Sequence, residues 1–426
     1  EFRRVLFRSV VASLLAGAVL LAVGGCADMD LLHVLKARVT GEALAVHVAP
    51  DGTIGGSNRG LDPSRPVGSL ARAVEIAKDS GATEIRVSEG RYDITSDDND
   101  HPNGWLRLES EVTIRGGYSA DFEDRDVNRY QSRIVVRGWL QTVVGCDFDA
   151  EYGSPPRPVG LVGLLFDIAL RDAVPETADS WSALLDLGGA TAATVENCTI
   201  QITTGGEFNR GVTALAVGGQ SDWDDSSPAE RVIVRNNTIL AISENGEDMT
   251  GLSVERLELG GGHEVWGNRI MVQGNDAVGL YVDGADDLMV ANNVISVRAK
   301  SGEDDAKARG ILCYNDLMSG RIVHNTLVSD STESDKDCAI EVRSSHLSTF
   351  YVSIQNNILV GRDSTASYGF YNGEADSNPD YSNNVCFGVS TPVYGPASGS
   401  GNEHEAADKF EPVFAEGWDE DLSDGD

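Results

Sequence analysis

One short phrase recurs through the second half of this 426-residue chain, and it restricts the fold more than any other feature. The phrase is a polar pair, most often Asn-Asn, set between aliphatic or β-branched residues. Copies stand at residues 195–200, 234–239, 265–270, 290–295, 322–327, 354–359 and 381–386. The second residue of the pair falls at 198, 237, 268, 293, 325, 357 and 384, so copies are 39, 31, 25, 32, 32 and 27 residues apart. A repeat of this length is typical of a solenoid.

Each copy predicts a strand, a tight bend and a second strand. Asn at the bend tolerates the left-handed backbone conformation that most residues resist, and the flanking residues alternate between apolar and polar types. A second phrase precedes most copies, as in Gly279-Leu280-Tyr281-Val282, and predicts a third strand. Coils of three strands, stacked about 4.8 Å apart, form an all-β right-handed parallel β-helix. We therefore interpret the Asn column as structural, because stacked amides satisfy buried polar groups from coil to coil.

The first 26 residues have the layout of an export signal. Arg3, Arg4 and Arg8 precede an uncharged run of 14 residues, from Val10 to Val23, which is short for a membrane span. The run continues to Gly24-Gly25-Cys26 and resembles the signal of bacterial lipoproteins, in which a Cys after small residues becomes lipidated. The resemblance implies an exported protein anchored to the cell envelope, at the outer membrane or cell surface, through a lipid on Cys26. The alternative is an ordinary signal peptide with a chance cysteine.

Residues 46–94 contain the only stretch that predicts a helix. The helix is expected over Ala71 to Lys78, with Leu70, Ala73, Val74 and Ala77 on one face. The order is a strand, Pro66-x-x-Ser69-Leu70, this helix, a glycine, a strand and Gly90-x-Tyr92. It resembles the amino-terminal cap of pectin-lyase-like β-helix proteins, in which the helix closes the open end of the coil stack. The resemblance spans roughly residues 46–415 and implies a fold rather than one activity, because this fold hosts many chemistries.

These features divide the chain into a signal peptide (1–26), a spacer (27–45), a β-helix domain (46–418) and an acidic tail (419–426). Within the domain, residues 46–94 form the predicted cap. Because the chain begins with Glu1 and stops in an acidic run, we expect it to be truncated at both ends. One elongated, monomeric domain fits its length better than several globular ones.

The charge balance excludes some partners. With 67 acidic and 33 basic residues, the formal net charge is −34, which argues against nucleic acid and against an anionic membrane surface. Acidic loops at 97–100, 222–225 and 303–305 are candidate Ca²⁺ loops. The solubility of a long solvated surface is the simpler explanation of these loops, and none matches a known Ca²⁺ motif.

Apart from Cys26 the chain has five cysteines, so at least one thiol is unpaired: Cys146, Cys198, Cys313, Cys338 and Cys386. Cys198 and Cys313 occupy positions expected to be buried. No Cys or His pair has the spacing of a zinc or iron site.

Aligning the strand phrase predicts which residues face out of the β-helix. Two inward columns follow from its copies: Leu215, Leu252, Leu280, Ile311, Ile340 and Phe370, then Val217, Val254, Val282, Cys313 and Val342. Because side chains alternate along a strand, two outward columns accompany them: Ala216, Ser253, Tyr281, Leu312, Glu341 and Tyr371, then Gly218, Glu255, Asp283, Tyr314, Arg343 and Gly373. Tyr281, Tyr314 and Tyr371 are candidates for stacking on sugar rings. In pectin-lyase-like enzymes, a comparable face binds polysaccharide.

Two catalytic mechanisms fit the charged residues of this face. A lyase would place Ca²⁺ on Glu255 and Asp283 and use Arg343 or a lysine as base. A hydrolase would use a carboxyl pair such as Asp283 and Glu341. However, no motif of the characterised pectate lyases or polygalacturonases is present, and we expect His263 to lie exposed in a loop. The face is also consistent with an ordinary solvated strand surface.

The favoured hypothesis is an exported, lipid-anchored surface protein that binds polysaccharide or another cell-surface glycan, or mediates adhesion, without catalysis. The alternative is a polysaccharide lyase or glycoside hydrolase that acts on uronate-containing glycans at the outer strand face, with Ca²⁺ as its only candidate cofactor. A passive scaffold is the third hypothesis.

Overall fold

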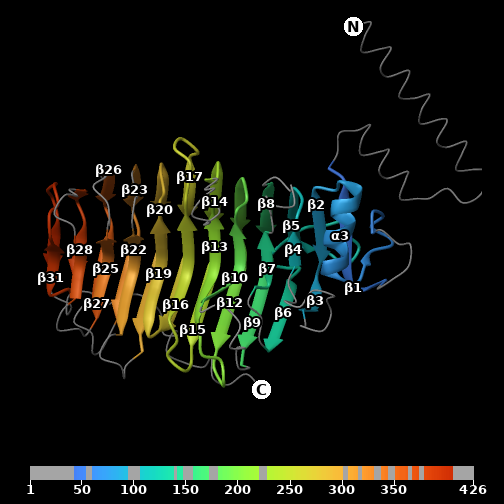
Figure 1. Ribbon diagram of the computed structural model, residues 1–426, viewed down its shortest axis with the longest axis horizontal. Coiled ribbons are helices and arrows are strands. Elements are labelled where there is room, and N and C mark those ends of the chain that lie inside the picture. Colours follow the sequence, from blue (N-terminus) through green and yellow to red (C-terminus); the bar gives the residue numbers. More distant parts are fainter. Residues whose placement is uncertain are drawn as a thin grey trace, which may run out of the picture.

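The computed structural model describes residues 43–53, 60–94, 106–138, 142–146, 157–171, 181–219, 228–300, 306–314, 319–330, 337–343, 351–362, 367–373 and 379–405. Figure 1 shows its strands stacked along the long axis of the molecule, from the helix-bearing amino-terminal end to β31 at the other. All pairings between the named strands are parallel and fall into three sheets. The fold is a right-handed parallel β-helix, as the repeat predicts.

Sheet A contains the strands that precede the Asn bend. Its order follows the chain, one strand per coil: β1 (Ala45–Thr53), β2 (Glu84–Ser88), β5 (Val112–Tyr118), β8 (Pro158–Val162), β11 (Ala192–Glu196), β14 (Arg231–Arg235), β17 (His263–Trp266), β20 (Leu288–Ala291), β23 (Ser319–Val323), β26 (Tyr351–Gln355) and β29 (Asp380–Ser382).

Sheet B contains the strands that follow the bend. They are β3 (Gly90–Ile94), β6 (Ser132–Gly138), β9 (Leu164–Leu170), β12 (Thr199–Thr204), β15 (Thr238–Ser243), β18 (Arg269–Gly274), β21 (Val294–Ala299), β24 (Thr326–Asp330), β27 (Ile358–Arg362), β30 (Val385–Phe387) and β32 (Glu403–Glu405).

Sheet C contains the strands of the second phrase. They are β4 (Leu106–Leu108), β7 (Val144–Cys146), β10 (Trp181–Gly188), β13 (Gly211–Gly218), β16 (Met249–Glu255), β19 (Asp276–Asp283), β22 (Lys307–Tyr314), β25 (Asp337–Arg343), β28 (Ser367–Asn372) and β31 (Thr391–Tyr394). Each full coil thus has one strand in each sheet.

The predicted capping helix is α3 (Leu70–Ser80). The Ser69 hydroxyl accepts a hydrogen bond from the Arg72 N–H at its start, and Gly81 ends it in the left-handed conformation at φ 71°. Its buried residues are Leu70, Ala73, Val74, Ile76 and Ala77, and it packs against β1, β2 and β4. The helix therefore covers the apolar core at the first coils (Figure 1).

The Asn column is a continuous ladder of hydrogen bonds. The first residue of each pair is left-handed, as at Asn236 and Asn292 (φ 54° and 56°). The second residue is buried and bonded to both neighbouring coils. Asn293 Oδ1 accepts the backbone N–H of Asn268 at 2.9 Å and its amide at 3.0 Å, while Asn293 Nδ2 donates to Asn325 Oδ1 at 3.0 Å. The ladder is structural, as predicted.

The ladder also extends one coil further than the repeat indicates. Asn402 Oδ1 accepts the N–H of Asn384 at 3.0 Å, directly after Gly401 in a left-handed bend. Its phrase lacks the flanking aliphatic residues, so the repeat pattern does not predict it. At the other end, the buried Cys198 takes the place of Asn, and its N–H donates to Asn237 Oδ1.

Several predictions fall outside the described residues: the signal and Cys26, the spacer except its last three residues, the three acidic loops and the acidic tail. In the part of the chain that the structure describes, no helix is long and apolar enough to cross a membrane.

Candidate functional site

The outer face of sheet C carries the residues aligned from the sequence. The strand register places Ser253, Tyr281, Leu312, Glu341 and Tyr371 in one column across β16, β19, β22, β25 and β28. Glu255, Asp283, Tyr314 and Arg343 form the next column. The two inward columns are buried as predicted, because their side chains fill the interior of the stack.

A third outward column was missed by the sequence alignment. It contains Val278, Arg309, Cys338 and Tyr368 in register. Between it and the other columns, two successive residues point inward, which breaks strict alternation. A Cβ at Gly279 would meet Ile295 Cγ2 in the core at 2.2 Å, so glycine fits at this inward position where a larger residue would force its neighbours to move. An alignment that assumes strict alternation assigns these residues to the wrong face of the strand, and it therefore misses this column.

Five tyrosines gather on this face, in two groups. Tyr281 and Tyr314 have ring centroids 6.2 Å apart. Tyr371 and Tyr394 stack 4.9 Å apart and 3° from parallel, and Tyr368 lies edge-on to both, at 5.2 and 5.6 Å. Tyr314 and Tyr394 are 39% and 49% exposed, which leaves ring surface for a ligand.

A chain of ion pairs lies between the two tyrosine groups. Arg309 Nη1 lies 2.5 Å from Asp276 Oδ1 and its Nε lies 2.6 Å from Glu341 Oε2, while Arg343 binds the other Glu341 oxygen. Glu341 is only 2% exposed, so it is not the solvated carboxylate that an outward position implies. The reason is that the two arginine side chains enclose it. Burial alone would lower the pKa of Arg309, but Asp276 and Glu341 raise it, so the guanidinium stays charged.

This arrangement bears on the two catalytic hypotheses. Glu341 is held by both arginines, and Arg343 is a weak candidate base because guanidinium groups stay protonated. Asp283 and Glu341 stand on β19 and β25, with β22 between them, so their strands are about 10 Å apart. The catalytic roles of Asp283, Glu341 and Arg343 stay predictions, with less support from the geometry than from the sequence.

The proposed Ca²⁺ pair consists of register neighbours. Glu255 and Asp283 pair across β16 and β19. Ser253 Oγ donates to Glu255 Oε1 at 2.6 Å, and the Tyr281 hydroxyl donates to Asp283 Oδ2 at 3.3 Å. Burial raises the pKa of Tyr281, and the Asp283 and Glu255 carboxylates raise it further, so its phenol remains a neutral donor. Among the described residues no group of three or more His, Cys, Asp or Glu side chains could hold a metal ion, and Ca²⁺ binding by this pair stays a prediction.

The prediction for His263 is wrong. It is the first residue of β17 and is fully buried. Its Nδ1 accepts the Val232 N–H at 3.1 Å and its Nε2 lies 2.8 Å from the Glu258 carbonyl oxygen. Both ring nitrogens therefore form hydrogen bonds with backbone groups. Because Nδ1 accepts a hydrogen bond, the proton of the ring lies on Nε2.

The buried cysteines are structural. No disulfide forms among Cys146, Cys198, Cys313, Cys338 and Cys386. Burial raises the pKa of Cys198 to about 11 and that of Cys313 to about 12, so neither is a reactive thiolate.

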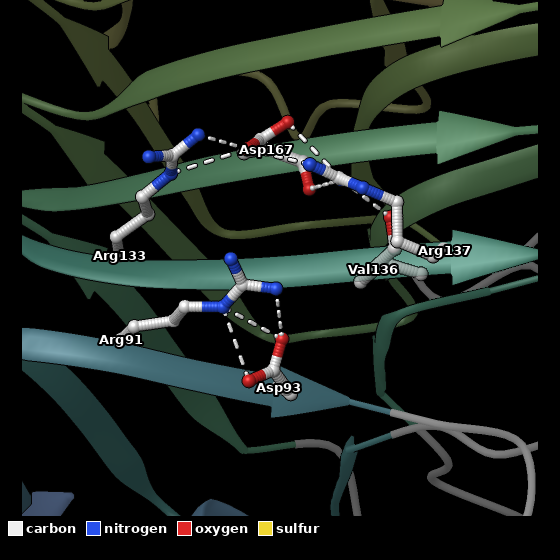
Figure 2. A network of polar contacts seen from close by, with 6 residues as sticks. All are labelled: Arg91, Asp93, Arg133, Val136, Arg137 and Asp167. Carbon is white, nitrogen blue, oxygen red and sulfur yellow. Dashed lines mark hydrogen bonds and ion pairs between the residues drawn. The ribbon is translucent and has the colours of Figure 1, made fainter. Parts of the chain in front are cut away.

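A separate charged cluster lies on the outer face of sheet B, near the amino-terminal end (Figure 2). Arg91 pairs with Asp93, while Arg133 and Arg137 approach Asp167 from both sides. Each arginine in this cluster has a carboxylate partner, and the pairs of Arg133 and Arg137 with Asp167 link the neighbouring strands β6 and β9.

No family description matches this chain, and no curated protein resembles it in sequence. Two solved structures, both from Azotobacter vinelandii, are similar to this chain. The mannuronan C-5 epimerase AlgE6 A-module is 13% identical, with a TM-score of 0.36, over 79% of this chain and 94% of that one. The AlgE4 A-module is also 13% identical, with a TM-score of 0.39, over 84% and 99%. Similarity at this level carries no inference about activity.

Proposed function

We propose that this chain is an exported, lipid-anchored β-helix protein of the bacterial cell envelope that binds polysaccharide on the outer face of sheet C without cleaving it. The observation that carries the proposal is the gathering of five tyrosines on that face, at two places separated by the ion pairs of Arg309, Glu341 and Arg343. The lipid on Cys26 rests on the sequence alone.

Tyrosine suits a sugar ligand for two reasons. Its ring presents an apolar face with negative electrostatic character to the C–H groups of a sugar ring, and its hydroxyl supplies a polar edge. The carboxylates of Glu255 and Asp283 lie in the same column as Tyr314 and are acceptors for sugar hydroxyl groups. A flat face built from stacked coils also matches an extended, repetitive ligand.

The charge of the face favours a neutral polysaccharide over a uronate polymer. Asp276, Asp283, Glu255 and Glu341 outnumber Arg309 and Arg343 among the residues described above, and both arginines are occupied by carboxylates. The whole chain carries a formal charge of −34, which repels a polyanion at low ionic strength.

The test is a pair of binding measurements on the full chain. Calorimetric titration with a neutral β-glucan should show binding, and the double variant Tyr371→Ala and Tyr394→Ala should weaken it by about tenfold or more, since it removes the stacked pair. Tyr130→Ala is the matched control, because that ring lies beside Arg129 in the connection between β5 and β6. Equal losses in both variants would contradict binding at sheet C.

The non-catalytic part of the proposal is tested with the same panel. Incubation with the neutral glucan and with polygalacturonate, each with and without Ca²⁺, should release no new reducing ends or unsaturated products. Turnover by the parent chain that Asp283→Ala abolishes would establish the enzyme alternative instead.

A further inference from the structure

We propose a second carbohydrate site, on sheet A, that binds a short oligosaccharide segment in a groove beside Trp266. The groove has a volume of about 630 Å³ and crosses four consecutive strands, β17, β20, β23 and β26. This volume is in the range of about 300–1,000 Å³ that is usual for small-ligand sites. The groove faces away from the tyrosines because sheets A and C are different sides of the β-helix.

Trp266 provides an aromatic surface at this groove. It is the last residue of β17 and 40% exposed. Its register neighbour in the next coil is Ala291, a side chain too small to cover the indole. A tryptophan that leaves this much of its ring to solvent presents a large, rigid and apolar face, which suits the C–H face of a sugar.

Polar groups stand around the indole. The Asp287 carboxylate and the Arg321 guanidinium line the groove, and neither has a protein partner among the described residues. Glu264 also lines it but is held by Arg235, whose Nε donates to Glu264 Oε2 at 2.8 Å. The lining of the groove therefore includes a carboxylate acceptor, a guanidinium donor, the Ser353 hydroxyl and the Met289 side chain.

These groups favour a saccharide over other small ligands. A sugar ring combines an apolar face with a rim of hydroxyl groups, each of which donates and accepts a hydrogen bond. The groove has the same combination: one aromatic plane, a thioether side chain and charged groups of both signs. Opposite charges at Asp287 and Arg321 admit both a neutral and an acidic sugar, and the experiment separates the two.

The site has a test that does not depend on the tyrosine face. Calorimetric titrations use two defined probes, cellohexaose as the neutral oligosaccharide and hexagalacturonate as the acidic one. At least one should bind the parent chain, and Trp266→Ala should weaken its binding by about tenfold, whereas Trp266→Phe should retain most of the affinity. Because Trp266 is partly exposed, the alanine variant should keep the parent's thermal unfolding midpoint.

The Arg321→Gln variant distinguishes the two probes. If the guanidinium contacts a carboxylate, the variant should lose more affinity for hexagalacturonate than for cellohexaose. If it contacts hydroxyl groups, the affinity for both hexamers should fall alike. Either result, together with the Trp266 effect, supports the site. The site is overturned if neither hexamer binds the parent chain, or if Trp266→Ala changes neither affinity by more than about twofold.

Failure of this site and failure of the proposed function have different signatures. Loss of binding in the Tyr371 and Tyr394 double variant but not in Trp266→Ala would leave the sheet C proposal standing and overturn the groove. The reverse pattern would retain the groove and overturn the sheet C site. Independent partial losses in both variants would support two sites.

Discussion

The buried asparagines are the residues on which the stack most depends. Each ladder amide bonds to the coil before it and the coil after it, so no buried amide group is left without a partner along the column. In an interior of low dielectric constant, an unpaired amide is costly and a paired one defines the register. This explains why Asn recurs there while the outer residues vary from coil to coil.

We expect Asn293→Ala to lower the free energy of unfolding by on the order of 3 kcal/mol, because it leaves the buried N–H of Asn268 without an acceptor. The matched control is the adjacent Asn292→Gly, at an exposed left-handed residue, φ 56°, that glycine adopts easily. It should change stability by less than about 1 kcal/mol. Urea unfolding followed by circular dichroism measures both, and equal effects would contradict a special role for the ladder amide.

Neighbouring strands are linked by charged side chains as well as by backbone bonds. On sheet B, Arg137 Nη2 lies 2.9 Å from Asp167 Oδ2, and Arg133 Nε lies 3.1 Å from the same oxygen (Figure 2). Burial raises the pKa of Asp167, but the hydrogen bonds from Arg137 and Arg133 outweigh it, so the pKa lies below its usual 3.8. These contacts connect β6 and β9.

This pairing predicts that the free energy of unfolding depends on pH. A carboxyl group with a lowered pKa in the folded state contributes stability above its unfolded pKa, and this contribution is lost as the pH falls through the folded value. The free energy of unfolding of the parent should therefore exceed that of Asp167→Asn by about 1 kcal/mol at pH 7. The difference should begin to fall at about pH 4 and should vanish only once the pH is below the lowered pKa of the folded state. Urea midpoints across this range measure it. A stability difference that stays constant at all acidic pH values measured would contradict an electrostatic origin of the Asp167 contribution. Asp93→Asn is the control, because the Arg91–Asp93 pair is exposed.

The molecule as a whole is a column with chemically different sides. Sheet C carries the tyrosines and an enclosed ion-pair chain, sheet A carries the Trp266 groove, and sheet B carries arginine–aspartate pairs near the cap. Such a column can present ligand sites along its length, since each coil contacts mainly its neighbours. A tether at one end would hold all three sides accessible at a membrane surface.

The proposed tether gives the last prediction. In cells that process lipoproteins, the natural protein should fractionate with membranes and incorporate labelled palmitate, and Cys26→Ala should abolish the label and release the protein. Cys146→Ala is the control, because that residue lies in β7 and is not at the signal. Membrane association that persists in Cys26→Ala would refute the lipid anchor.

The amino-acid sequence by itself determined the fold, because the fold is encoded locally and many times over. The Asn phrase, the strand phrase and the capping helix each specify their own conformation, and repetition aligns the coils, so the inward columns and Tyr281, Tyr314 and Tyr371 were placed correctly. Only the tertiary structure decided which groups meet across coils. The irregular alternation at Gly310 and Gly369 brought Arg309 and Tyr368 onto the face, Arg309 and Arg343 enclosed Glu341, and His263 became buried. The contacts of Arg309 with Glu341 and of His263 with Val232 join residues about 30 positions apart in the chain, which local periodicity does not encode.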